Sequence, residues 1–172
     1  ESLEKALASI DHNIDRQVSR GKVTVAEKAA ALGRIRTTMK LTDLGACDLI
    51  IEAATERETV KTAIFEDLVP HLKPTTILTS NTSSISITRL ASRTDRPEKF
   101  MGFHFMNPVP VMQLVELIRG IATDDPTYQT LLQVVTKLGK TAASAEDFPA
   151  FIVNRILMPM INEAVYTLYE GV

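Results

Sequence analysis

The stretch DLIIEAATERETVKTAIFEDLVPHLKPTTILTS, residues 48–80, decides the fold. Its continuous apolar run at 48–53 is typical of a parallel strand that is covered on both faces. Apolar residues at helical spacing then predict an amphipathic helix over 58–69, which Pro70 stops. A second apolar run at 76–79 predicts the next strand. This alternation of strand and helix indicates an α/β domain with a largely parallel sheet.

Upstream of this stretch, the sequence predicts two helices and one strand. Apolar residues recur at helical spacing over 1–18, and Gly21 follows as the expected residue just past the helix end. A capping box at 24–27 starts the second helix, which ends near Gly33. The apolar pattern at 35–39 then predicts a strand.

Downstream, strands and helices continue to alternate to the end of the sequence. The predicted elements are a helix at 86–92, strands at 100–105 and 114–118, a helix from the N-cap Asp125 to Gly139, a strand at 141–145 and a helix at 151–169.

The bulk composition is that of a soluble globular domain. The chain has 172 residues, of which 45% are hydrophobic and 23% charged, and its net charge is −2. This balance gives no reason to expect a nucleic acid or an anionic membrane as partner. The single cysteine, Cys47, excludes an intramolecular disulfide and fits a cytoplasmic location.

Both ends of the sequence look like cuts, because each lies within or beside a helical pattern. The helix at 151–169 is the segment most similar to a membrane span, but polar and charged residues such as Asn154 and Glu163 interrupt it. Such residues are costly in lipid, so we expect this helix to be buried in protein.

The stretch GFHFMNPVPVMQLVE, residues 102–116, contains the first candidate for chemistry. His104 lies between Phe103 and Phe105 at the end of an apolar strand, where burial disfavours its charged form and a carboxylate would favour it. If this strand pairs with the next one, Glu116 could face His104 and orient its ring, as in general acid/base catalysis. On spacing alone, a core histidine bonded to backbone, with Glu116 on a solvated face, is the more frequent arrangement.

Polar loops after two predicted strands, and one buried amide, are further candidates. The run SNTSS at 80–84 could bind a ligand at the carboxyl end of its strand, or could simply cap the following helix. Glu56 lies in the equivalent place after the preceding strand, where it could contact a ligand or stabilise a helix dipole. Asn154, on an apolar helix, is either bonded to protein or available to a substrate.

Other site classes find no support in the sequence. There is no Gly-x-Gly-x-x-Gly loop and no Gly-x-Ser-x-Gly nucleophile elbow. The three histidines, at 12, 71 and 104, are far apart and lack the carboxylate spacing of a metal site. A metal hydrolase and a serine hydrolase are therefore poor interpretations, and we expect no metal.

Three spaced motifs together closely resemble the 3-hydroxyacyl-CoA dehydrogenase family, and within it the bacterial short-chain, 3-hydroxybutyryl-CoA branch. They are SNTSS at 80–84, the histidine stretch at 102–116 and FIVNRILMP at 151–159, and the resemblance extends over essentially all 172 residues. Ala150 stands where the family usually has glycine.

The resemblance implies a Rossmann-like, largely parallel sheet with helices on both faces. Residues 1–147 would form this nucleotide-binding domain without its first β-α-β element, because the family's glycine-rich loop would precede Glu1. Residues 148–172 would begin the all-α C-terminal domain, which carries the substrate and dimer contacts. The isolated chain would then lack most of the cofactor anchor and be inactive.

The resemblance also implies an activity, the reversible oxidation of (S)-3-hydroxyacyl-CoA to 3-ketoacyl-CoA with NAD or NADP, with a short-chain thioester, 3-hydroxybutyryl-CoA, as the expected substrate. The partners would be the acyl-CoA and a second copy in a homodimer, without nucleic acid or membrane. Another two-domain hydroxyacid dehydrogenase and a non-catalytic structural relative are the alternatives. The implied residues are His104 as base, Glu116 as its partner, Ser83 and Asn154 for positioning, Glu56, Lys61, Ser83 and Asn107 for the cofactor, and Asn13, Arg20, Ser83 and Asn154 for the CoA substrate.

Overall fold

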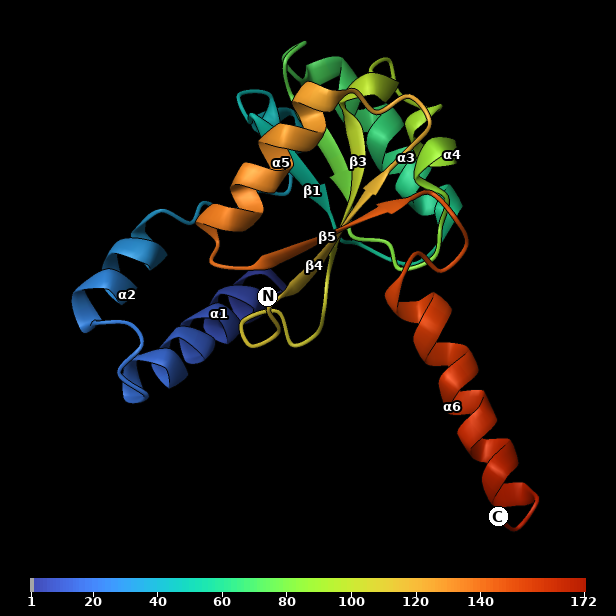
Figure 1. Ribbon diagram of the computed structural model, residues 1–172. Helices are drawn as coiled ribbons and strands as arrows, with labels where there is room; N and C mark the ends of the chain where they lie inside the picture. The colour runs from blue at the N-terminus through green and yellow to red at the C-terminus, as the bar shows by residue number, and fades with distance from the viewer. Residues whose placement is uncertain (1) are drawn as a thin grey trace. The chain divides into compact units, whose positions relative to one another are not determined.

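The computed structural model describes residues 2–172, which form six α-helices, three 3₁₀ helices and five strands (Figure 1). The chain divides into two compact units, residues 1–40 and residues 41–172. Glu1, predicted to belong to the first helix, lies outside the described residues.

The first unit contains the two predicted helices, α1 (Ser2–Ser19) and α2 (Val25–Gly33). Gly21 follows α1 with a φ of +67°, a conformation that glycine adopts at little cost. The predicted capping box precedes α2, since the Thr24 side chain accepts the N–H of Glu27 and the Glu27 carboxylate accepts the N–H of Thr24. Both helix predictions are confirmed.

The strand predicted at 35–39 is wrong, because this segment has no regular structure. An extended segment becomes a strand only when a neighbouring strand satisfies its backbone hydrogen-bonding groups. The side chains of Ile35 and Met39 are exposed, so the segment has no buried face either.

The second unit contains a five-stranded sheet in the order β1-β2-β3-β4-β5. Neighbouring strands are parallel except β3 and β4, which are antiparallel, so the predicted largely parallel sheet is confirmed. The antiparallel pair is joined by a loop at 106–113 that contains no helix, and a parallel crossover needs a longer connection. The strands are β1 (Leu49–Glu52), β2 (Ile77–Ser80), β3 (Phe100–Phe105), β4 (Leu114–Arg119) and β5 (Thr141–Glu146).

Helices cover both faces of this sheet, as expected (Figure 1). Phe65 and Ile87, from the helices of one face, belong to the same core cluster as Phe100 of β3. Met101, the next residue along β3, packs instead with Leu131 of α5 in a second cluster, because side chains alternate along a strand. The helices concerned are α3 (Glu58–Leu68) and α4 (Ile87–Ala91) on one face and α5 (Asp125–Lys137) on the other, and the 3₁₀ helices are Leu41–Leu44, Val69–His71 and Pro97–Lys99.

Several predicted helix ends differ from the structure by one or two residues, and two of these differences have a clear physical reason. The N-cap of α5 is Asp124, not Asp125, because Asp124 has the extended backbone and its side chain accepts the N–H of Thr127. Helix α3 ends at Leu68, and Pro70 lies in the 3₁₀ helix that follows. Proline is tolerated there because the first residues of a helix have no carbonyl partner for their N–H groups.

Helix α6 (Val153–Tyr169) follows the sheet and continues through Pro159. We expected this helix to be buried in protein, but its side chains from Met158 onward are exposed. Within the unit of residues 41–172, no other element covers that part of the helix. No helix in the described part of the chain is both long and apolar enough to cross a membrane.

Candidate active site

His104 and Glu116 meet on the sheet, as their spacing allowed. They occupy opposite positions in the antiparallel β3–β4 pair, and His104 Nδ1 lies 2.7 Å from Glu116 Oε2. The Glu116 side chain is 0% exposed, and His104 is also buried. The frequent alternative, with Glu116 on a solvated face, is therefore wrong.

The second carboxylate oxygen of Glu116 binds the start of α6. Oε1 accepts the backbone N–H groups of Ile152 and Val153, at 2.9 and 2.8 Å. Burial raises the pKa of Glu116, but the hydrogen bonds from His104 and from these two N–H groups outweigh it and lower that pKa below its usual value. Glu116 is thus a stable anion that joins the histidine to a helix N-terminus.

Gly102 brings β3 close to the side chains beneath it. A Cβ atom at Gly102 would lie 2.8 Å from Cβ of Ile118 and 3.0 Å from Cδ1 of Ile87. Real side chains do not approach this closely, so only glycine fits here without movement. The position lies two residues before His104, on the same face of β3.

Glu56 organises the SNTSS loop at 80–84 by accepting hydrogen bonds from several of its hydroxyl and N–H groups. Glu56 Oε1 accepts the hydroxyl of Thr82 at 2.5 Å and the backbone N–H groups of Ser83 and Ser84 at 2.9 and 3.2 Å. Burial raises the pKa of Glu56, but these hydrogen bonds and nearby Lys61 lower it overall. Glu56 therefore shapes the loop, and it is also placed at the carboxyl edge of the sheet.

Asn154 joins α6 to the same loop. Its Nδ2 donates to the carbonyl oxygen of Ser83 at 3.3 Å. Asn154 lies one residue after Val153, which Glu116 binds, so the two predicted pairs are linked through the first turn of α6. The structure thereby brings His104, Glu116, Ser83 and Asn154 into one connected group.

Lys61 is 2% exposed, and its partner Glu52 was not singled out from the sequence. Its Nζ donates to both carboxylate oxygens of Glu52, at 2.9 and 2.7 Å, and lies 3.9 Å from Glu56. The Ser80 hydroxyl also donates to Glu52, at 2.7 Å. The sequence signal that could have identified this pair is an acid inside an apolar strand, Glu52, followed by a lysine on the next helix, Lys61.

Asp147 is a second residue that the sequence analysis missed. Its carboxylate accepts the Ser86 hydroxyl and the backbone N–H groups of Ile87 and Thr88 at the start of α4. The available hint was an acid two residues after the strand predicted at 141–145 and two residues before Pro149.

The remaining predicted residues are exposed. Asn107 lies in the loop after β3, in the same unit as His104 and Glu116. Asn13 on α1 and Arg20 just after that helix belong to the unit of residues 1–40. Their assignments to cofactor and CoA stay predictions.

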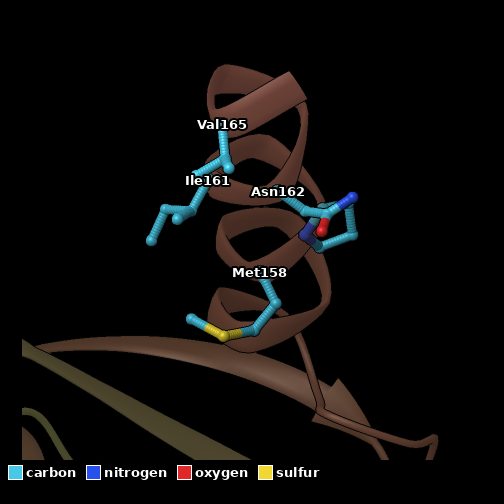
Figure 2. Close-up of a pocket in the computed structure, with 5 residues that line it drawn as sticks. Met158, Ile161, Asn162 and Val165 are labelled. Atoms are coloured by element: carbon cyan, nitrogen blue, oxygen red, sulfur yellow. The ribbon is translucent and has the colours of Figure 1, made fainter. Parts of the chain in front are cut away.

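An open, mostly apolar surface lies along α6 and is formed by residues of that helix alone. Figure 2 shows Met158, Ile161 and Val165 along one side of the helix, with Asn162 directed elsewhere. The lining contains no ionisable side chain, so it offers an apolar contact surface rather than a site for proton transfer. Among residues 2–172 there is no group of three His, Cys, Asp or Glu side chains placed to hold a metal ion.

Comparison with known proteins places the chain in a family. The family described as 3-hydroxyacyl-CoA dehydrogenase, NAD binding domain, matches residues 1–148. A 3-hydroxybutyryl-CoA dehydrogenase of Bradyrhizobium diazoefficiens is 62% identical over 170 residues, covering 99% of this chain and 58% of the relative. A probable 3-hydroxybutyryl-CoA dehydrogenase of Deinococcus radiodurans is 48% identical over 172 residues, covering 100% of this chain and 62% of the relative.

Solved structures agree with this placement. The crystal structure of (S)-3-hydroxybutyryl-CoA dehydrogenase from Ralstonia eutropha matches with a TM-score of 0.94 and 46% identity, covering 98% of this chain and 59% of that one. The chain thus spans about three fifths of the length of these relatives. The predicted Rossmann-like fold is confirmed, and the chain belongs to the 3-hydroxyacyl-CoA dehydrogenase family, whose NAD-binding domain it carries.

Proposed function

We propose that this chain supplies the acid/base and substrate-positioning residues of an NAD-dependent (S)-3-hydroxyacyl-CoA dehydrogenase that acts on short-chain thioesters. The observation that carries the proposal is the buried contact of His104 with Glu116, 2.7 Å long, joined through α6 to Ser83 and Asn154. A base oriented by a carboxylate, beside two polar groups, is what removal of a hydroxyl proton requires.

His104 takes the proton of the 3-hydroxyl group during oxidation and returns it during reduction. Its Nδ1 is engaged by Glu116, which leaves Nε2 to face the substrate oxygen. The imidazolium that forms is stabilised by the adjacent anion, whose lowered pKa keeps it charged at neutral pH. The carboxylate therefore favours the protonated state that the reaction creates.

Ser83 and Asn154 hold the substrate oxygen in line with His104. The Ser83 hydroxyl and the Asn154 amide come from different elements, a loop after β2 and the first turn of α6. Holding a reactant between two such groups restricts its rotation and favours a reactive geometry.

When bound, NAD would supply the acceptor for the hydride from C3. The polar side chains at the carboxyl edge of the sheet suit a bound nicotinamide ring. Ser83 and Glu56 lie after β2 and β1, and Asn107 is exposed after β3. Lys61 supports this edge indirectly, because its ammonium group forms an ion pair with Glu52 and lies close to the Glu56 carboxylate. The backbone cradle of a dinucleotide pyrophosphate, a glycine-rich turn, is not present in residues 1–172.

The CoA part of the substrate is assigned to α1. Asn13 and Arg20 are exposed, and Arg20 with Lys22 forms a cationic cluster at the end of the helix that suits phosphate groups. Acyl-CoA thioesters, rather than free hydroxy acids, are therefore the proposed substrates.

Residues 1–147 form the nucleotide-binding domain in this proposal, and residues 148–172 begin a helical domain. The exposed apolar side chains of α6, including Met158, Ile161 and Val165, support this division, because such a stripe needs a partner surface. A homodimer formed through the helical domain and a cytoplasmic location complete the proposal.

The test is a coenzyme-linked turnover assay on the full-length protein that contains this chain. We expect oxidation of (S)-3-hydroxybutyryl-CoA with NAD and much slower turnover of free 3-hydroxybutyrate. Equal rates with the thioester and the free acid would overturn the substrate assignment. No turnover of any 3-hydroxyacyl-CoA would favour the non-catalytic relative.

A further inference from the structure

Asp147 fastens the segment after β5 to the start of α4. Its Oδ2 accepts the Ser86 hydroxyl at 2.7 Å and the N–H of Thr88 at 2.8 Å, and its Oδ1 accepts the N–H of Ile87 at 2.9 Å. Burial raises the pKa of Asp147, but these hydrogen bonds lower it below its usual value overall. The carboxylate is therefore charged at neutral pH, and both of its oxygens are occupied.

Glu116 fastens the other end of the same segment. The linker 147–153 thus runs between two buried or half-buried carboxylates, Asp147 at its start and Glu116 against Ile152 and Val153 at its end. Of the seven residues of this linker, all of them described by the structure, only Phe151 is buried.

Asn154 depends on this linker for its position. It lies in the first turn of α6, whose side chains from Met158 onward are exposed, so packing of the rest of the helix within the unit of residues 41–172 does not hold it. The hydrogen bond that its side chain donates to the Ser83 carbonyl oxygen is long, at 3.3 Å. A weak contact of this kind needs its two partners to be placed by other interactions.

We propose that Asp147 is a positioning residue for the dehydrogenase reaction, which fixes the linker so that Asn154 reaches the loop of Ser83. The inference rests on the proposed function and extends it to a residue that does not touch substrate or coenzyme. Without Asp147, the linker is held at one end only and the first turn of α6 pivots about Glu116. The substrate oxygen then loses its alignment, which lowers the rate of the chemical step.

The experiment measures steady-state kinetics of the full-length protein and of five variants, four single and one double. Asp147→Ala removes the hydrogen bonds to Ser86, Ile87 and Thr88, and Asp147→Asn keeps the shape of the side chain and part of its hydrogen bonding. Glu146→Ala removes the neighbouring exposed carboxylate and is the matched control. Asn154→Ala removes the group through which Asp147 is inferred to act, and it is combined with Asp147→Ala in a double variant.

We expect Asp147→Ala to lower kcat by about 10-fold to 100-fold, the usual effect of a misplaced reacting group. Asp147→Asn should recover part of the loss, and Glu146→Ala should match the wild type. In the Asn154→Ala background, Asp147→Ala should lower kcat by less than 3-fold, on the order of the scatter of such cycles. Amide hydrogen exchange at 150–155 should become faster in Asp147→Ala but not in Glu146→Ala.

Losses that multiply in the double variant would overturn the inference, because Asp147 would then act independently of Asn154. A normal kcat in Asp147→Ala, with an active wild type, would also overturn it and leave the proposed function intact. Fast turnover together with a lowered melting temperature would show a role in stability alone. A wild-type protein without turnover would instead overturn the proposed function.

Discussion

Ala150 is held in a conformation that favours glycine, and Ala150→Gly should therefore stabilise the protein. The φ angle of Ala150 is +68°, in the left-handed region where a Cβ atom is too close to the following carbonyl oxygen. This conformation costs an alanine about 1–2 kcal/mol. Glycine avoids that cost but loses about 0.5–1 kcal/mol through the greater freedom of its unfolded chain.

The difference predicts a gain of about 0.5–1 kcal/mol in the free energy of unfolding. Urea unfolding of the full-length protein measures it, followed by the same emission or ellipticity signal for wild type and variant. Ala143→Gly is the matched control, because Ala143 lies inside β5 with no positive φ, and there glycine should destabilise by about 0.5–1 kcal/mol. A loss of stability in Ala150→Gly similar to that of the control would refute this reasoning.

Three further predictions follow from the geometry. Gly102→Ala should destabilise by about 1–3 kcal/mol and lower kcat, because the new Cβ would lie 2.8 Å from Ile118; a melting curve equal to the wild type would contradict it. Glu116 and Asp147 have lowered pKa values in the folded state, so their contribution to stability is present above about pH 4 and is lost as pH falls through the lower folded values. Urea titrations at pH 7, 5 and 3 measure this, and Glu116→Gln should flatten the dependence. The isolated 172-residue chain should show negligible turnover and low solubility, since β1 is a terminal strand of the sheet with Ile51 44% exposed; robust turnover with micromolar coenzyme affinity would disprove it.

Much of the fold was predictable because local patterns agree with the final contacts. The apolar runs at 48–53 and 100–105 predicted buried strands, and the capping box before α2 marked its start correctly. The strand at 35–39 was wrong because an apolar pattern cannot show whether a neighbouring strand is available. The burial of α6 in the same way depends on what covers its face, which no pattern within the helix can show.

The candidate site was predictable where two residues share a strand pair. The loop between β3 and β4 fixes the register, so the facing of His104 and Glu116 followed once pairing was assumed. The second role of Glu116 is to accept the N–H groups of Ile152 and Val153 at the start of α6. These residues are separated from Glu116 by 36 and 37 positions in the sequence, so no local pattern indicates the contact. Asp147 and Glu52 were missed for the same reason, because their partners are backbone groups and side chains from other elements.

The central claim, that His104 and Glu116 act as one unit in proton transfer, is tested by a double-mutant cycle. In the full-length protein, His104→Gln should lower kcat by about 10²-fold to 10⁴-fold, the usual contribution of a positioned general base. Glu116→Gln should also act mainly on kcat, because the amide keeps the shape but removes the charge beside the imidazole. The N–H groups of Ile152 and Val153 would lose their anionic acceptor as well, which adds a smaller loss through α6.

The decisive measurement is kcat of the double variant relative to the two single variants, with (S)-3-hydroxybutyryl-CoA as substrate. Because both changes damage the same proton transfer, the double variant should lose far less than the product of the single losses. Any excess over His104→Gln alone then measures the second contact of Glu116, with α6. Strictly multiplicative losses, or a His104→Gln enzyme with near-normal kcat, would contradict the account.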